Sequence, residues 1–171
     1  MALESKTFDF IEKEIRKKQF GILSTISPKE WVQSSGVHYG VSPKALNFAL
    51  YILTDSRYKK VQNIQKQPRI SFAIPYPHYY LRFIPPGTIS FQGTAEILPF
   101  EDSDARKSYT KSSLRRMVRY TEKSAYRDSA VFLKISPNKR ISCFGLGVSL
   151  IKMMKDPEEG YYSILIPSTR L

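Results

Sequence analysis

The sequence is short of the residues that form disulfides and metal centres. It contains one cysteine, Cys143, and two histidines, His38 and His78, among 171 residues. One cysteine cannot form an internal disulfide or a cysteine-based metal site, and two histidines are too few for a site of several histidines. The sequence therefore excludes a disulfide-stapled or zinc-finger domain. It favours a reducing compartment, and we expect a cytoplasmic protein.

Long hydrophobic runs are also missing. No stretch approaches the roughly 20 consecutive apolar residues that are needed to span a bilayer. The first residues include Glu4 and Lys6, and no apolar core of signal-peptide length follows them. We therefore expect neither insertion into a membrane nor export.

Negative charge is scarce. The sequence has 27 lysines and arginines against 15 aspartates and glutamates, which gives a net charge of +12. Such an excess favours an anionic partner, namely nucleic acid, a phosphorylated cofactor or an acidic membrane surface, although it also fits a charge that only maintains solubility. With 42% hydrophobic residues, the composition is typical of one globular domain, here residues 1–171.

The order of hydrophobic patterns predicts a mainly β protein with flanking helices. In residues 88–97, apolar or small residues alternate with polar ones, which is typical of a strand with one buried face. We expect mostly antiparallel strands in a closed or partly closed barrel. The expected strands are 19–27, 30–41, 47–54, 69–75, 88–97, 130–135, 140–145 and 161–167, and the expected helices are 7–18, 57–67 and 103–123.

The start of the helix expected at 57–67 is a candidate anion site. A helix N-terminus offers unpaired backbone N–H groups and the positive end of the helix dipole. Thr54 and Ser56 would add hydroxyl donors, and Lys59 and Lys60 would add positive charge. Asp55 leaves an alternative open, because a carboxylate there could cap the helix itself and repel an anion.

The same stretch carries a resemblance to a known family. Its elements are Thr54, Lys59-Lys60, Asn63-Ile64, Pro68-Arg69 and Ile70-Ser71, and the later Gly93-Thr94-Ala95-Glu96 adds a glycine-x-alanine step. In this order, over roughly residues 8–98, they resemble the flavin-binding split barrels of the pyridoxamine phosphate oxidase-like superfamily. The resemblance implies a split β-barrel of the FMN-binding type.

The resemblance further implies a homodimer with FMN in a groove between two split barrels. The phosphate would lie against Thr54, Ser56, Lys59 and Lys60. The isoalloxazine ring would lie along a strand segment earlier in the chain, and a polar contact to the ring would come from the start of the strand expected at 88–97. The residues implied for these ring contacts are His38, Tyr39, Gly40, Val41 and Thr88.

The implied function is an FMN-dependent oxidoreductase that transfers hydride or electrons to or from a small-molecule substrate. The resemblance identifies neither the substrate nor a catalytic residue. True pyridoxamine phosphate oxidases carry a tryptophan and an arginine-histidine pair in their C-terminal part, which hold the vitamin substrate. Here the one tryptophan, Trp31, lies in the early hairpin and no histidine follows His78, so vitamin oxidation is disfavoured. A deazaflavin is an alternative cofactor, and haem is another, with His38 or His78 as its axial ligand.

A binding module for nucleic acid is the alternative from a different class. The helix expected at 103–123 carries seven cations against Asp104 and Glu122, so its net charge is 7 − 2 = +5. Such a surface suits a phosphate backbone, although a solvated helix face has the same composition. We do not expect a nucleic-acid partner, because the tyrosines and phenylalanines are concentrated in the expected strands and in one loop, without the basic and stacking motif of the common RNA-binding modules. The aromatic connection at residues 76–87 is expected to pack or to form an interface.

Overall fold

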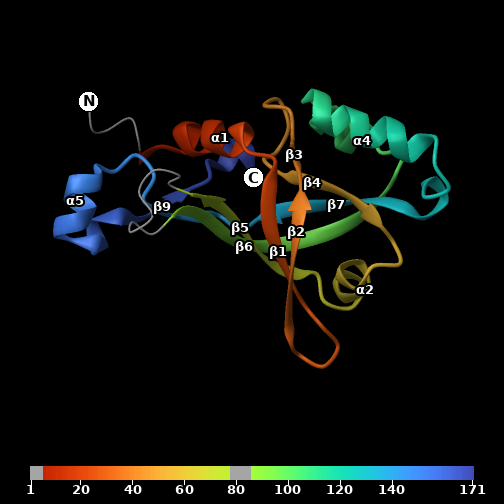
Figure 1. The fold of residues 1–171 in the computed structure, drawn as a ribbon, viewed down its shortest axis with the longest axis horizontal. Helices are drawn as coiled ribbons and strands as arrows, with labels where there is room; N and C mark the ends of the chain where they lie inside the picture. The colour runs from red at the N-terminus through yellow and green to blue at the C-terminus, as the bar shows by residue number, and fades with distance from the viewer. Residues whose placement is uncertain (1–5, 78–85) are drawn as a thin grey trace.

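The centre of the fold is a curled antiparallel sheet, seen in the computed structural model, which describes residues 6–77 and 86–171 (Figure 1). Over these residues the main path of the sheet runs β2-β1-β5-β6-β7-β4-β3, and β8 pairs with both β6 and β9. The strands are β1 (Phe20–Ile26), β2 (Val32–His38), β3 (Gly40–Val41), β4 (Leu50–Asp55), β5 (Arg69–Tyr76), β6 (Gly87–Pro99), β7 (Ala130–Pro137), β8 (Arg140–Phe144) and β9 (Tyr161–Leu165).

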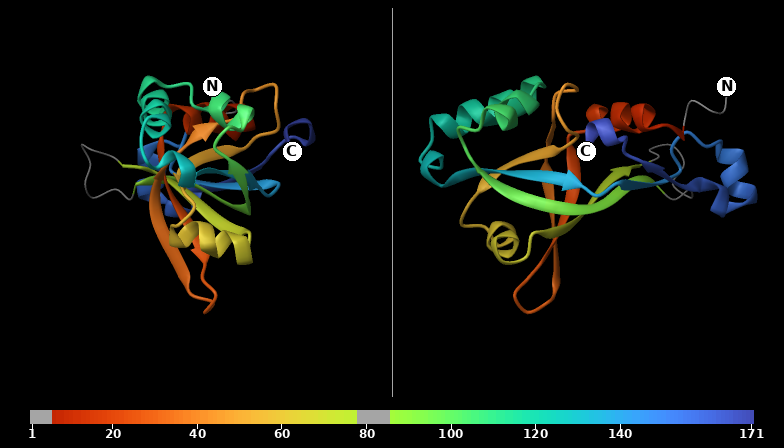
Figure 2. Two further views of the ribbon diagram at one scale, coloured as in Figure 1. Left: turned by 90° about the vertical axis from the view of Figure 1, so that its right-hand side faces the viewer. Right: turned by 180° about the vertical axis from the view of Figure 1, so that it is seen from behind.

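Helices flank this sheet at several places. They are α1 (Phe8–Lys17), α2 (Lys59–Lys66), α3 (Ser103–Ser108), α4 (Ser112–Glu122) and α5 (Leu150–Lys155). In two views, α4 and α2 lie on opposite sides of the strands, and β8, β9 and α5 extend away from both of them (Figures 1 and 2). The predicted architecture, mostly antiparallel β with flanking helices, is confirmed.

The long strand β6 connects the two parts of the sheet. It pairs with β5 along one edge, whereas its other edge pairs first with β8 and then, from Gly93 onward, with β7. At Gly93 the backbone of β7 comes very close, since a Cβ atom there would lie 2.2 Å from the carbonyl oxygen of Ser136. Glycine is therefore required where β6 changes partner, which gives a physical reason for the glycine-x-alanine step.

The apolar core fills the inside of the curl. Phe72 is fully buried and stacks on Phe91, with ring centroids 5.6 Å apart. A second, smaller cluster lies under α3 and α4, where Phe132 contacts the rings of Phe100 and Tyr109. Two hydrophobic clusters thus hold the helices to the sheet.

The helix expected at 103–123 is two helices, and this prediction is corrected. The chain leaves the helical conformation at Tyr109, whose side chain is 1% exposed. Its hydroxyl oxygen accepts a hydrogen bond from the backbone N–H of Leu53 at 2.6 Å. Burial of this ring and pairing of that N–H group require the chain to turn toward the sheet, so α3 ends before α4 begins.

The strand expected at 30–41 is also divided. β2 pairs with β1 as far as His38, whereas Gly40–Val41 pairs with β4 at the other end of the sheet path. Tyr39 lies between the two strands, is buried, and donates a hydrogen bond from its hydroxyl to the carbonyl oxygen of Ile15 at 2.9 Å. The chain therefore changes partner at Tyr39.

Within residues 6–77 and 86–171, the helices are all too short or too polar to cross a bilayer.

Candidate functional site

The turn between β4 and α2 is organised by Asp55. Its Oδ1 accepts hydrogen bonds from the backbone N–H and the Nε of Arg57, both at 2.9 Å. Its Oδ2 accepts from Arg57 Nη2 at 2.6 Å and from Ser129 Oγ at 2.7 Å. The carboxylate therefore neutralises Arg57 and binds the turn to the segment before β7, and it does not cap α2.

The N-terminus of α2 is consequently open to a ligand. Its N-cap residue is Tyr58, and no described side chain caps it by a hydrogen bond. Lys59 and Lys60 form the first turn of the helix. Asp55 therefore does not cap α2, contrary to the alternative that the sequence left open. The backbone N–H groups at the start of α2 stay available to an anion.

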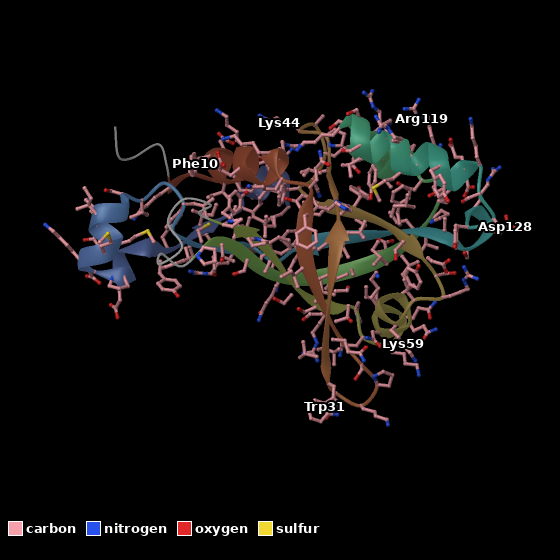
Figure 3. All side chains as sticks on the ribbon, in the orientation of Figure 1. Phe10, Trp31, Lys44, Lys59, Arg119 and Asp128 are labelled. Atoms are coloured by element: carbon pink, nitrogen blue, oxygen red, sulfur yellow. The ribbon has the colours of Figure 1, made fainter. Side chains whose placement is uncertain are left out.

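A hollow of about 480 Å³ lies between this helix start and the β1–β2 hairpin. Figure 3 labels Lys59 at the start of α2 and Trp31 near the tip of the hairpin. The hollow is lined by Thr25, Gln33, Ser34, Ser35, Tyr58, Lys59 and Lys60. It combines two cations with hydroxyl and amide groups, which suits a phosphorylated polar ligand.

Lys60 is the most informative cation of this hollow. Its Nζ lies 4.8 Å from the centre of the Tyr58 ring, and burial lowers its pKa. No carboxylate of the described residues lies within ion-pair distance of it. A partly desolvated ammonium group without a counter-charge favours binding of an anion.

Ser35 supplies a second unsatisfied group in the same hollow. Its Oγ is buried and has no hydrogen-bond partner among the described residues. A buried hydroxyl that lacks a partner is uncommon in folded proteins, and a bound ligand is one way to satisfy it. Over the part of the chain that the structure describes, the lining therefore combines a charge without a counter-ion and a buried hydroxyl without a hydrogen-bond partner.

Asn63 holds the two walls of the hollow together. Its Nδ2 donates hydrogen bonds to Thr25 Oγ1 at 3.0 Å and to Gln33 Oε1 at 2.9 Å, and the residue is 2% exposed. Sequence reasoning used Asn63 only as part of a motif and gave it no role at the site. The available signal was a polar residue next to Ile64 on the buried side of α2.

The other predicted phosphate contacts lie close by in sequence but do not line the hollow. Thr54 is half-buried in β4, where it pairs with Val131 of β7. Ser56 donates its backbone N–H to the carbonyl oxygen of Ser129 at 2.8 Å. Of the four residues predicted for the phosphate, the structure brings Lys59 and Lys60 together with the β1–β2 hairpin.

The segment predicted to contact the ring is not at this hollow. His38 is exposed at the far end of β2, three residues beyond Ser35, or about 10 Å along the strand. Tyr39, Gly40 and Val41 are buried and border a separate cavity of about 70 Å³.

Space beside Gly40 is filled by the protein itself. A Cβ atom at this position would lie 2.6 Å from Ser108 Oγ and 2.7 Å from the carbonyl oxygen of Ser108. The close approach that this glycine permits is therefore to the end of α3.

Thr88 is also distant from α2. The strand β6 passes α2 near Ala95, whose N–H donates to the carbonyl oxygen of Pro68 at 2.9 Å. Thr88 lies seven residues away, about 23 Å along the strand. His78 and most of the aromatic connection lie outside the described residues, and the described part of the chain contains no cluster of potential metal ligands.

The Asp55 carboxylate should make stability depend on pH. Its hydrogen bonds with Arg57 hold its pKa well below the ordinary value of about 3.9. A carboxyl group whose pKa is lowered by folding stabilises the native state above its unfolded pKa, and this contribution is lost as the pH falls toward the folded pKa. In Asp55→Asn, the loss in unfolding free energy should be largest near neutral pH and should shrink below about pH 4.

Urea unfolding of both proteins at about pH 7 and about pH 3 measures this difference. Asp9→Asn is the control, since Asp9 is exposed on α1. A difference between wild type and Asp55→Asn that stays constant over this pH range would contradict the role of the charge.

The curled sheet, with its flanking helices and the hollow beside α2, defines the class of the protein as a split β-barrel. A family model described as pyridoxamine 5'-phosphate oxidase matches residues 8–142. The chain therefore belongs to the pyridoxamine 5'-phosphate oxidase family, as its sequence motifs predicted.

Solved structures share this fold at low sequence identity. The heme storage protein HutZ from Vibrio cholerae has a TM-score of 0.65 and 11% identity, over 83% of this chain and 97% of its own. General Stress Protein 26 from Bacillus anthracis str. Sterne has a TM-score of 0.52 and 24% identity, over 77% and 88%. A protein named F420 reductase has a TM-score of 0.54 and 18% identity, over 74% and 92%. No curated protein matches the sequence significantly.

Proposed function

We propose that the protein binds FMN in the hollow between α2 and the β1–β2 hairpin and acts as a flavin-dependent oxidoreductase on a small molecule. The observation that carries this proposal is Lys60. It is a partly buried cation without a carboxylate partner among the described residues, and it lies at the uncapped start of α2. A dianionic phosphate monoester supplies the missing charge and accepts hydrogen bonds from helix N–H groups.

The lining of the hollow fits the parts of this cofactor. Lys59 and Lys60 would hold the phosphate, and Gln33, Ser34 and Ser35 would contact the polar groups of the ribityl chain or the ring. β2 is an edge strand of the main sheet path, so its outer backbone groups can bind a polar ring edge. When bound, the flavin supplies hydride or electron transfer, while the protein positions it.

A second copy of the chain is the proposed partner at this site. The outer face of the β1–β2 hairpin exposes Phe20, Ile22 and Val32, which are 47%, 37% and 68% exposed. In the register of the hairpin, Ile22 faces Gly36 and Ser24 faces Ser34, so small residues adjoin the apolar ones. An exposed apolar surface next to the hollow is suited to self-association.

Two relatives bear names that suggest other cofactors for this fold. HutZ is named a heme storage protein, and another is named F420 reductase. Haem needs an axial ligand. The histidine within the described residues, His38, is exposed and lies about 10 Å along β2 from Ser35, so it is not placed to bind a haem iron in the hollow. A deazaflavin has a flavin-like ring and a phosphate, so it is the alternative cofactor with the same chemical demands.

The experiment is an absorption spectrum of the freshly purified protein, followed by titrations with FMN, riboflavin and F420. We expect a flavin spectrum, or saturable quenching of FMN fluorescence, and at least tenfold weaker binding of riboflavin, which lacks the phosphate. Light scattering should give the mass of a dimer. Tight binding of F420 without FMN would replace the cofactor, a Soret band would indicate haem, and binding of none of them would overturn the proposal.

A further inference from the structure

The outer face of α4 is a second basic surface, separate from the hollow beside α2. Leu114 and Val118 are buried against the sheet, so the opposite side of the helix faces solvent. That side carries Arg115, Arg116, Arg119 and Lys123, all exposed. Figure 3 labels Arg119, whose side chain projects away from the sheet.

These four cations form a stripe along the helix. Arg115, Arg119 and Lys123 are successive residues at a spacing of four, so each lies about 6 Å further along the axis. Arg116 lies beside them, three positions before Arg119. Like charges at these spacings destabilise a helix, so the stripe is not explained by the folding of α4 itself.

The two acidic residues within 103–123, Asp104 and Glu122, are already paired with other cations. Asp104 lies 3.6 Å from Lys107, and Glu122 forms an ion pair with Arg106. Within residues 6–77 and 86–171, the four cations of the stripe have no ion-pair partner. The stripe is therefore an uncompensated positive surface that complements a polyanion.

Aromatic rings and a groove accompany the charge. Tyr120 is 68% exposed and follows Arg116 by one turn, and Tyr126, beyond the end of the helix, is 53% exposed. A hollow of about 500 Å³ lies along α4 and is bordered by Arg115 and Arg119, and also by the Arg106–Glu122 ion pair. Exposed rings next to cations are suited to nucleic-acid bases that stack beside a bound phosphate backbone.

We propose that the outer face of α4 binds single-stranded nucleic acid, with the stripe on the phosphates and Tyr120 and Tyr126 on the bases. A lipid surface fits this face less well. The apolar residues Leu114 and Val118 of α4 are buried, so this face has none of the large aliphatic side chains that enter a bilayer. The proposal is independent of the flavin site, because α2 and α4 lie on opposite sides of the sheet (Figures 1 and 2).

The test uses the full chain and a fluorescein-labelled single strand of about 20 nucleotides, as DNA and as RNA, with anisotropy as the readout. Four neutralised phosphates predict a slope of about −2.8 for log K against log salt, or about 50-fold weaker binding at about 200 mM than at about 50 mM salt. Arg115→Gln/Arg116→Gln/Arg119→Gln should weaken binding at least about tenfold and reduce the slope to about −0.7. Glutamine keeps a high helix propensity, so the fold should be retained.

The matched control is Lys139→Gln/Lys152→Gln/Lys155→Gln, which removes the same charge from exposed positions elsewhere. It should weaken binding less than about threefold, because only the long-range attraction changes. Tyr120→Ala/Tyr126→Ala should weaken binding at least about fivefold with an unchanged salt slope, since stacking is lost and the phosphate contacts remain.

Several results would overturn the proposal. Equal losses in the two charge variants would show attraction by net charge alone. Equal binding of a duplex of the same sequence, together with no effect of the tyrosine variant, would refute the single-strand assignment. Binding to vesicles with about 30% phosphatidylserine, but not to the oligonucleotides, would reassign the face to a membrane surface.

Discussion

Replacing Lys59 and Lys60 together by alanine is expected to weaken FMN binding by about 100-fold or more. A charge-assisted contact to a phosphate contributes about 1.5–3 kcal/mol, and about 1.4 kcal/mol corresponds to a factor of ten in affinity. Two such contacts therefore multiply to at least two orders of magnitude. Fluorescence titration of FMN with each protein measures the change.

The control for this variant is Lys152→Ala/Lys155→Ala, which removes the same charge from α5. It should leave FMN affinity within about threefold, because those lysines act only through screened, long-range attraction. Riboflavin binding should change little in Lys59→Ala/Lys60→Ala, since riboflavin has no phosphate. Unchanged FMN affinity in that variant would exclude the start of α2 as the phosphate site.

Replacing Glu12 by alanine is expected to lower the free energy of unfolding by about 3–5 kcal/mol. The Glu12 side chain is 4% exposed, and its Oε1 lies 2.5 Å from Arg16 Nη2 and 2.8 Å from Arg170 Nη2. Removal of one partner from a buried ion pair leaves the other charges uncompensated, which costs about this amount. Arg170 Nη1 also donates to the carbonyl oxygen of Leu46 at 2.7 Å, so the network joins three segments of the chain.

Urea unfolding followed by circular dichroism gives the comparison. Glu14→Ala is the matched control on the same helix, because Glu14 pairs with the exposed Lys17. The Lys17 side chain is 57% exposed, and a pair with one solvent-exposed partner contributes about 0–1 kcal/mol, so this control should lose much less stability than Glu12→Ala. A loss of less than about 1 kcal/mol in Glu12→Ala would show that the two arginines find other partners when the carboxylate is absent.

The parts of the fold that depend on local pattern could be predicted from the sequence. The alternation in residues 88–97 corresponds to β6, with Ile89 and Phe91 buried. The basic residues at the start of the helix expected at 57–67 do begin α2, and the hollow lies there. In these cases neighbouring residues determine which side of an element is buried.

Features that depend on distant contacts could not be predicted. The gap between α3 and α4 results from the bond between Tyr109 and the backbone of Leu53, 56 residues away. The β2 side of the hollow depends on Asn63, which contacts Gln33 across 30 residues. The division of residues 30–41 into two strands also depends on distant contacts, because the chain pairs with β1 as far as His38 and with β4 from Gly40.

The change of partner along β6 limits which changes β8 and β9 can tolerate. One continuous backbone hydrogen-bonds to β8 at Thr88–Ser90 and to β7 from Gly93 to Pro99. The β8–β9 pair is therefore not a separate module that could be exchanged or deleted without disturbing the barrel, because the strand that holds it is also a strand of the barrel. We expect changes in β8 or β9 to affect the barrel through β6, and most of all at Gly93, where the close approach of β7 leaves no room for a side chain.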